Sequence, residues 1–402
     1  AAGRQGDLDA AARWPDESFA AVAARNEANA GFLARLEAID AAVLDESQQV
    51  SHAVLDYLLR SAVTLAPFEP ERIAFTNDSG FFSFPGSLAL STRPQSVAEA
   101  EAWIRRIETL PAYFEQNTAW LRRGMETGVV QPQYIVPGVI AQIETLAGTP
   151  AAESLLFAPL RNLPAQLTEA ERTRLQAAAL AAIEHYALPA YRELLVFFRD
   201  EYLAAARTTV GIYDVPGGRE YYRALVRYHT TRDMTPEQVH EVGRAEVGRI
   251  RAEMEKVIAR TGFEGSFAEF LEFMRTDPQF YARSEEELLK HAAWLAKRAD
   301  DQMPRFFRNL PRLPYGVRPV PASMAPHYTT GRYWPGNLEG GVAGGYMVNT
   351  YALDQRPLYE LPALTVHEGV PGHHHQFAVA QELEGVPEFR RQSYITAYGE
   401  GW

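Results

Sequence analysis

The 402-residue sequence predicts a mainly α-helical protein. Long segments repeat apolar residues at the helical period, and they begin with residue types that cap helices. One short run, GYMVNTYAL at residues 345–353, has instead the β-branched and aromatic composition of a strand. Proline and glycine dominate residues 311–345, where we expect irregular chain and no regular helix.

The first predicted helices lie in the N-terminal part of the chain. Residues 17–43 are rich in alanine, with apolar positions near the helical period. Residues 96–110 open with Ser96 and Glu99, the pattern of a capping box in which each side chain bonds the other residue's backbone N–H. Their apolar side chains recur on one side and predict a buried face: Trp103, Ile104, Ile107 and Leu110.

Two further helices precede the irregular segment. Residues 235–258 begin with Thr235 as the N-cap, Pro236 at the first helical position and Gln238, whose side chain can reach back to the cap. Residues 284–303 carry an acidic first turn, which suits the positive end of the helix dipole. The apolar residues of the 235–258 helix predict a buried stripe: Val239, Val242, Ile250, Met254 and Val257.

Composition limits the chemistry of the chain. The formal net charge is -12 and no basic stripe is visible, so a nucleic-acid partner is not expected. No stretch approaches the run of about 18 apolar residues that a transmembrane helix needs. The opening AAGRQGDLDA lacks the apolar segment of a signal peptide. Because the sequence has no cysteine, a tightly bound transition metal would have to use histidine, aspartate and glutamate.

The motif TVHEGVPGHHHQ, residues 365–376, gathers four of the ten histidines. In the zinc-peptidase motif His-Glu-x-x-His, two histidines one helical turn apart share a zinc ion, and the glutamate takes a proton from the bound water. Here the next histidine after His367 is His373, which lies on another face of a regular helix. His374 returns to the same face but lies roughly 10 Å further along the axis. A regular helix would therefore not make a metal site.

Proline and glycine within the motif change that expectation. Pro371 has no N–H and disfavours helical geometry at the residue before it, while Gly369 and Gly372 tolerate unusual dihedral angles. A bulge or kink can absorb the extra residues and swing a later histidine back toward His367.

We therefore expect His367 and His373 to be metal ligands, with His374 in reserve and Glu368 as the general base. His375 is expected to lie behind the ligands or on the surface. The alternative is a histidine cluster without a metal. Burying four histidines between apolar segments without polar partners would be costly, which favours the metal site.

A catalytic zinc site needs a third protein ligand and one open position. Glu400, in the downstream stretch SYITAYGEGW, fits a site that is completed by a glutamate of a following helix. Gly399, Gly401 and Trp402 surround it, which predicts close packing there. Three rival glutamates lie in a polar turn region and are expected to be exposed: Glu382, Glu384 and Glu388.

The stretches HEGVPGHHHQ and YGEGW resemble the bacterial family labelled domain of unknown function 885, grouped with zincin-like metallopeptidases. Further similar stretches extend over nearly the whole chain, among them GVVQPQYIV, VPGGREYYRALVRYHTTRDMTPEQVHEVG and YMVNT. The resemblance implies a helical gluzincin-like metallopeptidase fold with a small β-sheet beside a deep cleft. It favours His373 over His374, and it implies a chain that continues beyond Trp402. The residues that match the family motif are His367, Glu368, Pro371, Gly372, His373 and Glu400.

The family resemblance also suggests residues that contact substrate. In zincins an edge strand can pair with an extended peptide, so Asn349 on the predicted strand could bond substrate backbone. Tyr398 and Tyr394 could donate hydrogen bonds in the site, although core packing is the expected role of each. Arg332 could bind a substrate carboxylate. His229 lies near a helix start and is not expected to be catalytic.

These observations together predict a peptidase for short peptides with one Zn²⁺ ion. We expect residues 1–310 to form a helical scaffold. Residues 311–402 would hold the irregular segment, the edge strand and the metal-site helices, as one continuous unit that is incomplete at its C-terminus. The alternatives are a catalytically silent metal- or peptide-binding protein and a zinc hydrolase of a non-peptide amide. Family relatives favour an exported or membrane-anchored location outside the cytoplasm.

Overall fold

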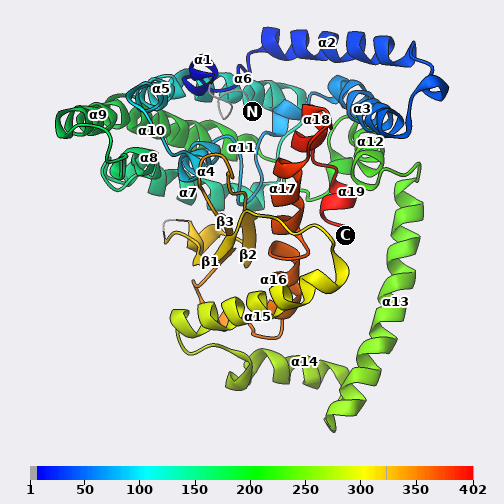
Figure 1. Ribbon diagram of the computed structural model, residues 1–402. Coiled ribbons are helices and arrows are strands. Elements are labelled where there is room, and N and C mark those ends of the chain that lie inside the picture. The colour runs from blue at the N-terminus through cyan, green and yellow to red at the C-terminus, as the bar shows by residue number, and fades with distance from the viewer. Residues whose placement is uncertain (1–6, 323, 402) are drawn as a thin grey trace. The chain divides into compact units, whose positions relative to one another are not determined.

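The computed structural model describes residues 7–322 and 324–401 (Figure 1). Contacts within the chain divide it into two units, residues 1–221 with 385–393 and residues 222–384 with 394–402. Helices predominate in both, and one small sheet lies in the second unit, so the predicted mainly α fold is confirmed. Within the described ranges, no helix is both long and apolar enough to cross a membrane. The predicted packing of Trp402 against Glu400 concerns a residue outside the described ranges.

The first unit is a helical array around an aromatic core. The predicted face of α5 is confirmed, because Trp103, Ile104 and Ile107 are buried and Leu110 at the start of α6 is fully buried. Its helices are α1 (Leu8–Ala11), α2 (Phe19–Glu37), α3 (Glu46–Leu65), α4 (Phe84–Ser91), α5 (Val97–Glu108), α6 (Leu110–Thr127), α7 (Val136–Gly148), α8 (Ala158–Arg161), α9 (Glu169–Ala182), α10 (Leu188–Val196), α11 (Leu203–Ala205) and α18 (Glu388–Gln392).

The predicted capping box of α5 forms only in part. The Ser96 hydroxyl accepts from the Glu99 N–H at 3.2 Å, as predicted. The Glu99 carboxylate, however, accepts from the N–H of Gln95 at 2.8 Å, one residue before the cap. The start of α5 is still stabilised, because a carboxylate in the first turn interacts favourably with the helix dipole.

The second unit holds a three-stranded sheet with helices around it. The chain enters it within α12 (Gly218–Thr230). The helices predicted from 235 and 284 are confirmed as α13 and α15, with Thr235 and Ser284 as N-caps. Its elements are α13 (Pro236–Thr261), α14 (Phe267–Thr276), α15 (Glu285–Phe306), β1 (Tyr315–Pro319), β2 (Gly331–Trp334), β3 (Gly344–Val348), α16 (Leu361–Glu368), α17 (His373–Glu382) and α19 (Thr396–Gly399).

The predicted strand is confirmed as β3, but it is not an edge strand. The sheet order is β1-β3-β2, with β1 parallel and β2 antiparallel to β3. Both edges of β3 are thus already paired, so a peptide cannot add to it by β-augmentation. The two outer strands lie in the proline- and glycine-rich segment, where the sequence suggested only irregular chain.

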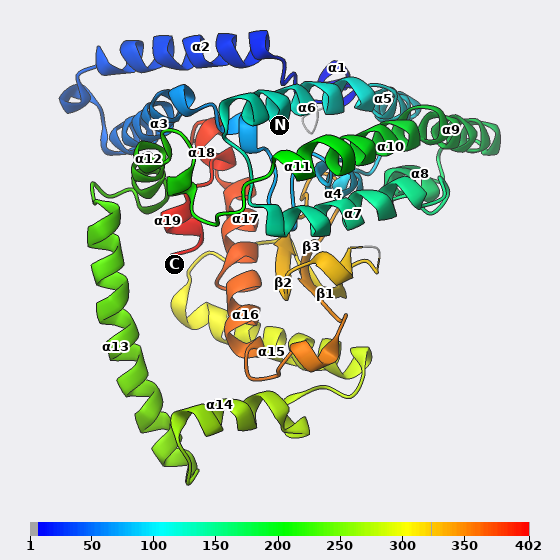
Figure 2. The ribbon, with the colours of Figure 1, turned by 180° about the vertical axis from the view of Figure 1, so that it is seen from behind.

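The sheet provides the platform for the motif helices. Tyr346 and Val348 of β3 pack in one core with Leu288 of α15 and Leu361 of α16. Met347 points to the other face, beside Val320. Figure 2, which shows the reverse view, has α16 and α17 following one another alongside the sheet, with α15 crossing near α16.

The predicted buried stripe of α13 is wrong. Val242 is 54% exposed and Ile250 46% exposed, and Met254 and Val257 are also exposed. In both views α13 stands apart from the sheet of the second unit, and it contacts α14 near its own C-terminal end. Periodicity predicts a helix with an apolar face, but it does not say whether another element covers that face.

Candidate metal centre

The motif forms two helices interrupted by a bulge. α16 ends at Glu368 and α17 begins at His373, so residues 369–372 leave the helical path between them. Backbone hydrogen bonds close this excursion: Gly372 N–H donates to the Val366 carbonyl at 3.0 Å and His374 N–H donates to that of Gly369 at 3.1 Å. The chain therefore resumes its helix as if the extra residues were absent.

Glycine is required on both sides of the bulge. A side chain at Gly372 would overlap the carbonyl of His367. A Cβ on Gly369 would lie 2.8 Å from the Thr365 carbonyl oxygen and 3.0 Å from the Tyr315 hydroxyl. The prediction that glycine permits the chain to turn here thus has a steric basis, which is the close return of the backbone onto α16.

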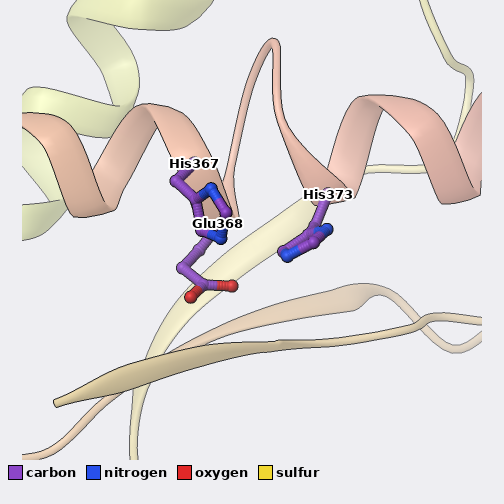
Figure 3. Close-up of side chains that lie close together, drawn as sticks. All are labelled: His367, Glu368 and His373. Atoms are coloured by element: carbon purple, nitrogen blue, oxygen red, sulfur yellow. The ribbon is translucent and has the colours of Figure 1, made fainter. Parts of the chain in front are cut away.

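The bulge brings His367 and His373 together. Their ring centroids are 4.5 Å apart at an angle of 70°. One potential ligand atom from each of His367, Glu368 and His373 lies within 4.8 Å of the others. Figure 3 shows the three side chains pointing to the same side of the two helices. His374 does not take part in this cluster.

Glu400 joins the two histidines from a later segment. Its Oε2 lies 3.4 Å from His367 Nε2 and 3.7 Å from His373 Nε2. Ligand atoms about 2.0–2.1 Å from a zinc ion are separated by about 3.3 Å in a tetrahedron. The donor set, two imidazoles and a carboxylate, therefore fits one zinc ion in both chemistry and spacing.

The third ligand could in principle be either glutamate. The cluster of His367, Glu368 and His373 is the looser one, since its atoms are separated by up to 4.8 Å. Glu400 lies closer to both imidazoles. Glu368 is also held elsewhere, because its Oε2 accepts from the Tyr333 N–H at 2.6 Å. Glu400 is therefore the better placed of the two carboxylates to serve as a third ligand, with Glu368 beside it.

Burial changes the proton affinity of the groups in this cluster. It raises the pKa of Glu368, an effect that the Tyr333 hydrogen bond and the nearby His367 partly oppose. Burial lowers the pKa of His373, whose side chain is only 11% exposed. This shift favours the neutral form of His373, which is the form that can bind a metal. Glu400 and His367 are more open, with side chains 49% and 42% exposed, which leaves one side of the cluster accessible.

The other two histidines have different surroundings. His374 is buried beside Tyr315 and bonds the Tyr333 hydroxyl at 3.0 Å through Nδ1. Burial lowers the pKa of His374 to about 4, so it is a neutral packing residue. His375 is half-buried against Phe307, with ring centroids 4.6 Å apart, and burial lowers its pKa. Neither ring takes part in the cluster.

Two tyrosines of the site were missed or undervalued in the sequence. Tyr333 on β2 holds Glu368 through its backbone and His374 through its hydroxyl. For Tyr394 the sequence allows a hydrogen bond in the site but favours packing; its ring stacks on Phe377, and its hydroxyl also donates to Glu400 Oε1 at 2.5 Å. Tyr333 was missed because glycines and prolines surround it, so the sequence around it does not show the alternating pattern that predicts a strand.

Two residues that were predicted to contact substrate, Asn349 and Tyr398, differ sharply in their exposure to solvent. Asn349 is fully buried; its amide donates to the carbonyls of Ala325 and Tyr328 at 2.9 and 3.0 Å, and its oxygen accepts from Tyr351 N–H. The predicted substrate hydrogen bond of Asn349 is therefore not available. Tyr398 is 60% exposed on α19, so core packing is wrong for it.

Three further residues can be placed. Arg332 is exposed on β2, with its guanidinium 5.3 Å from the centroid of the Tyr328 ring. His229 lies near the end of α12, not at a helix start, with Nδ1 3.3 Å from the Thr396 hydroxyl. Of the rival glutamates, Glu382 accepts from the N–H and guanidinium of Arg312, at 2.7 and 3.1 Å.

A cavity of about 590 Å³ lies between α15 and α16. Trp294 and Arg298 line it from α15, and Thr365 and Val366 line it from α16. It is thus next to His367 along the chain, but no residue of the ligand cluster lines it. The predicted deep cleft beside the ligands stays a prediction.

Comparison with known proteins finds one matching family model and a solved structure with a similar fold. A family model described as "Bacterial protein of unknown function (DUF885)" matches residues 1–402. A solved structure described as that of "the putative lipoprotein from Colwellia psychrerythraea" is similar with a TM-score of 0.84 and 21% identity, over 96% of this chain and 68% of that one. At this identity the likeness shows a shared fold. No curated protein matches the sequence.

Proposed function

The chain belongs to the bacterial family of unknown function DUF885, and we propose that it is a zinc-dependent peptidase of the zincin-like, gluzincin type. The observation that carries the proposal is the convergence of Glu400 on His367 and His373, at 3.4 and 3.7 Å, beside the buried Glu368. Two histidines from a motif with an adjacent glutamate, completed by a later glutamate, are the ligand set of such peptidases.

Each residue has a separate task in this proposal. A bound zinc ion would polarise the scissile carbonyl and lower the pKa of a water molecule. His367, His373 and Glu400 would hold the ion, and the Glu400 carboxylate would offset part of its charge. Glu368 would accept a proton from the attacking water and return it to the leaving amine. Because Tyr333 N–H occupies Oε2, Oε1 of Glu368 is the oxygen left to take the proton.

Short peptides are the proposed substrates, by analogy with other helical gluzincins. The fold shared with the lipoprotein-like structure from Colwellia psychrerythraea supports an exported location for this chain. Both statements depend on likeness at the level of fold, whereas the ligand assignment depends on distances within this chain.

Metal content and cleavage of a peptide library together test the proposal. We expect protein purified without chelators to carry or take up one zinc ion per chain, and to cleave peptides. Glu368→Gln should keep the metal and lose activity by about 10²–10⁴-fold, because general acid–base catalysis contributes that much. Glu115→Gln, an exposed glutamate on α6, is the matched control and should behave as wild type.

The possible failures have different meanings. Bound zinc without cleavage of any peptide would contradict the peptidase. It would leave a silent binding protein or a zinc hydrolase of non-peptide amides. An assay with non-peptide amides would then distinguish these two. Protein that neither carries nor takes up zinc would contradict the ligand assignment itself. Full activity of Glu368→Gln would contradict its role as general base.

A further inference from the structure

Glu400 needs support to serve as a ligand. It is the C-cap residue of the four-residue α19, and its side chain is half-exposed. The Tyr394 hydroxyl donates to Oε1 at 2.5 Å, which leaves Oε2 as the oxygen nearest His367 and His373. We propose that Tyr394 is a positioning residue that holds the Glu400 carboxylate in its metal-binding orientation. This inference rests on the proposed function.

The ring of Tyr394 is itself held by an aromatic stack. It lies parallel to Phe377, at an interplanar angle of 6° and a centroid distance of 5.9 Å. Phe377 follows His373 by one helical turn on α17, and its other stacked neighbour is Tyr333, at 5.9 Å and 28°. We call Tyr333, Phe377 and Tyr394 the aromatic stack.

The two end residues of the aromatic stack each bond one glutamate of the site. At one end the backbone N–H of Tyr333 bonds Glu368, and at the other end the hydroxyl of Tyr394 bonds Glu400. Phe377 in the middle belongs to the helix that carries His373. Residues that hold the ligands of a metal in this way set their orientation and typically change metal affinity by about 10–100-fold when altered.

Gly399 allows Tyr394 to come this close. A Cβ at Gly399 would overlap the Tyr394 ring and hydroxyl. The residue before Glu400 therefore has to be glycine for the ring to lie against the backbone and reach the carboxylate. The YGEGW stretch thus has a physical reason for the glycine that precedes its glutamate.

The hydrogen bond between Tyr394 and Glu400 could instead only stabilise the turn that joins them. The two roles differ in what they predict. A turn-stabilising bond contributes to the folding of the metal-free protein, so its loss lowers the melting temperature without zinc. A positioning bond contributes to zinc affinity, and only when Glu400 is present to be positioned.

Zinc affinity of the full chain, measured by competition with a chromophoric chelator, separates these roles. We expect Tyr394→Phe to weaken zinc binding by 10–100-fold, and Phe377→Leu, which keeps the hydroxyl, to weaken it less. Tyr134→Phe, at a tyrosine that is 70% exposed, is the matched control and should leave affinity within twofold. In a Glu400→Gln background, adding Tyr394→Phe should have no further effect.

The outcomes are distinct. Wild-type affinity in Tyr394→Phe, or an equal loss with and without the Glu400 carboxylate, would overturn the inference. So would a lowered melting temperature of metal-free Tyr394→Phe with unchanged zinc affinity, since it would show a structural bond alone. Failure of the wild-type chain to bind zinc would instead overturn the proposed function.

Discussion

His373 and His374 are neighbours in sequence but have different chemistry. The ring of His373 faces His367 at 4.5 Å, whereas the ring of His374 lies 4.4 Å from Tyr315 and bonds Tyr333. His373 therefore lies with His367 in the candidate metal centre, and His374 belongs to the packing around the two tyrosines. The bulge decides between them, because it determines which residue occupies the first position of α17.

Substitution of each histidine should affect a different property. We expect His373→Ala to weaken zinc binding by more than about 100-fold, beyond the effect of an outer-shell residue, with a small change in unfolding free energy. His374→Ala should lower the unfolding free energy by about 2–4 kcal/mol, through a lost hydrogen bond and a cavity, with a smaller effect on zinc affinity. Chelator competition and urea unfolding measure the two. The opposite pattern would make His374 the ligand.

Asn349 offers a second prediction at the scale of one residue. Its buried amide donates to the carbonyls of Ala325, Tyr328 and Thr329, so it fixes the loop before β2. Asn349→Ala removes these hydrogen bonds from a fully buried position and should lower the unfolding free energy by about 2–3 kcal/mol. The KM for peptides should stay the same in the folded protein. A raised KM with unchanged stability in urea would restore the substrate role that its position on a strand suggested.

The bulge between α16 and α17 is the element that makes the site. Sequence reasoning could predict that a regular helix fails here and that proline and glycine repair the spacing, since both statements follow from local geometry. It could predict the helices with strong caps and the strand β3. It could not predict that β1 and β2 flank β3, because the proline and glycine content of residues 311–345 indicates irregular chain. It also could not predict the exposure of α13 or the bond between Tyr394 and Glu400.

Gly372→Ala tests the bulge directly. A methyl group there overlaps the His367 carbonyl, so the backbone must move. We expect zinc affinity to fall by more than 10-fold and the unfolding free energy by more than about 1 kcal/mol, the usual sign of a residue forced into an incompatible conformation. Gly138→Ala on α7 is the matched control: its Cβ meets nothing within 4 Å, and it should stabilise by about 0.5–1 kcal/mol. Unchanged zinc binding in Gly372→Ala would show that the bulge tolerates a side chain.

At the scale of the whole molecule, the candidate site brings together separate lengths of chain within the second unit. α16 and α17 supply the two histidines, and Glu400 follows only after residues 385–393, which belong to the first unit. A metal bound by all three residues would therefore connect two segments of the second unit, residues 222–384 and 394–402. Residues 385–393, which belong to the first unit, separate these segments in the sequence. Removal of the metal should release the later segment first, because the half-exposed Glu400 side chain would lose the metal and keep the Tyr394 hydrogen bond.

Chelation should therefore destabilise the protein in a localised way. At free zinc about 100-fold above its Kd, binding stabilises the folded state by about 2.7 kcal/mol, and removing the zinc should lower the melting temperature accordingly. Hydrogen exchange should become faster in residues 361–382 and 394–401 and stay unchanged in α5–α7, which form the core of the first unit. His367→Ala is the control, since its melting temperature should not respond to chelator. An equal change in exchange throughout both units would contradict a metal that acts at this site.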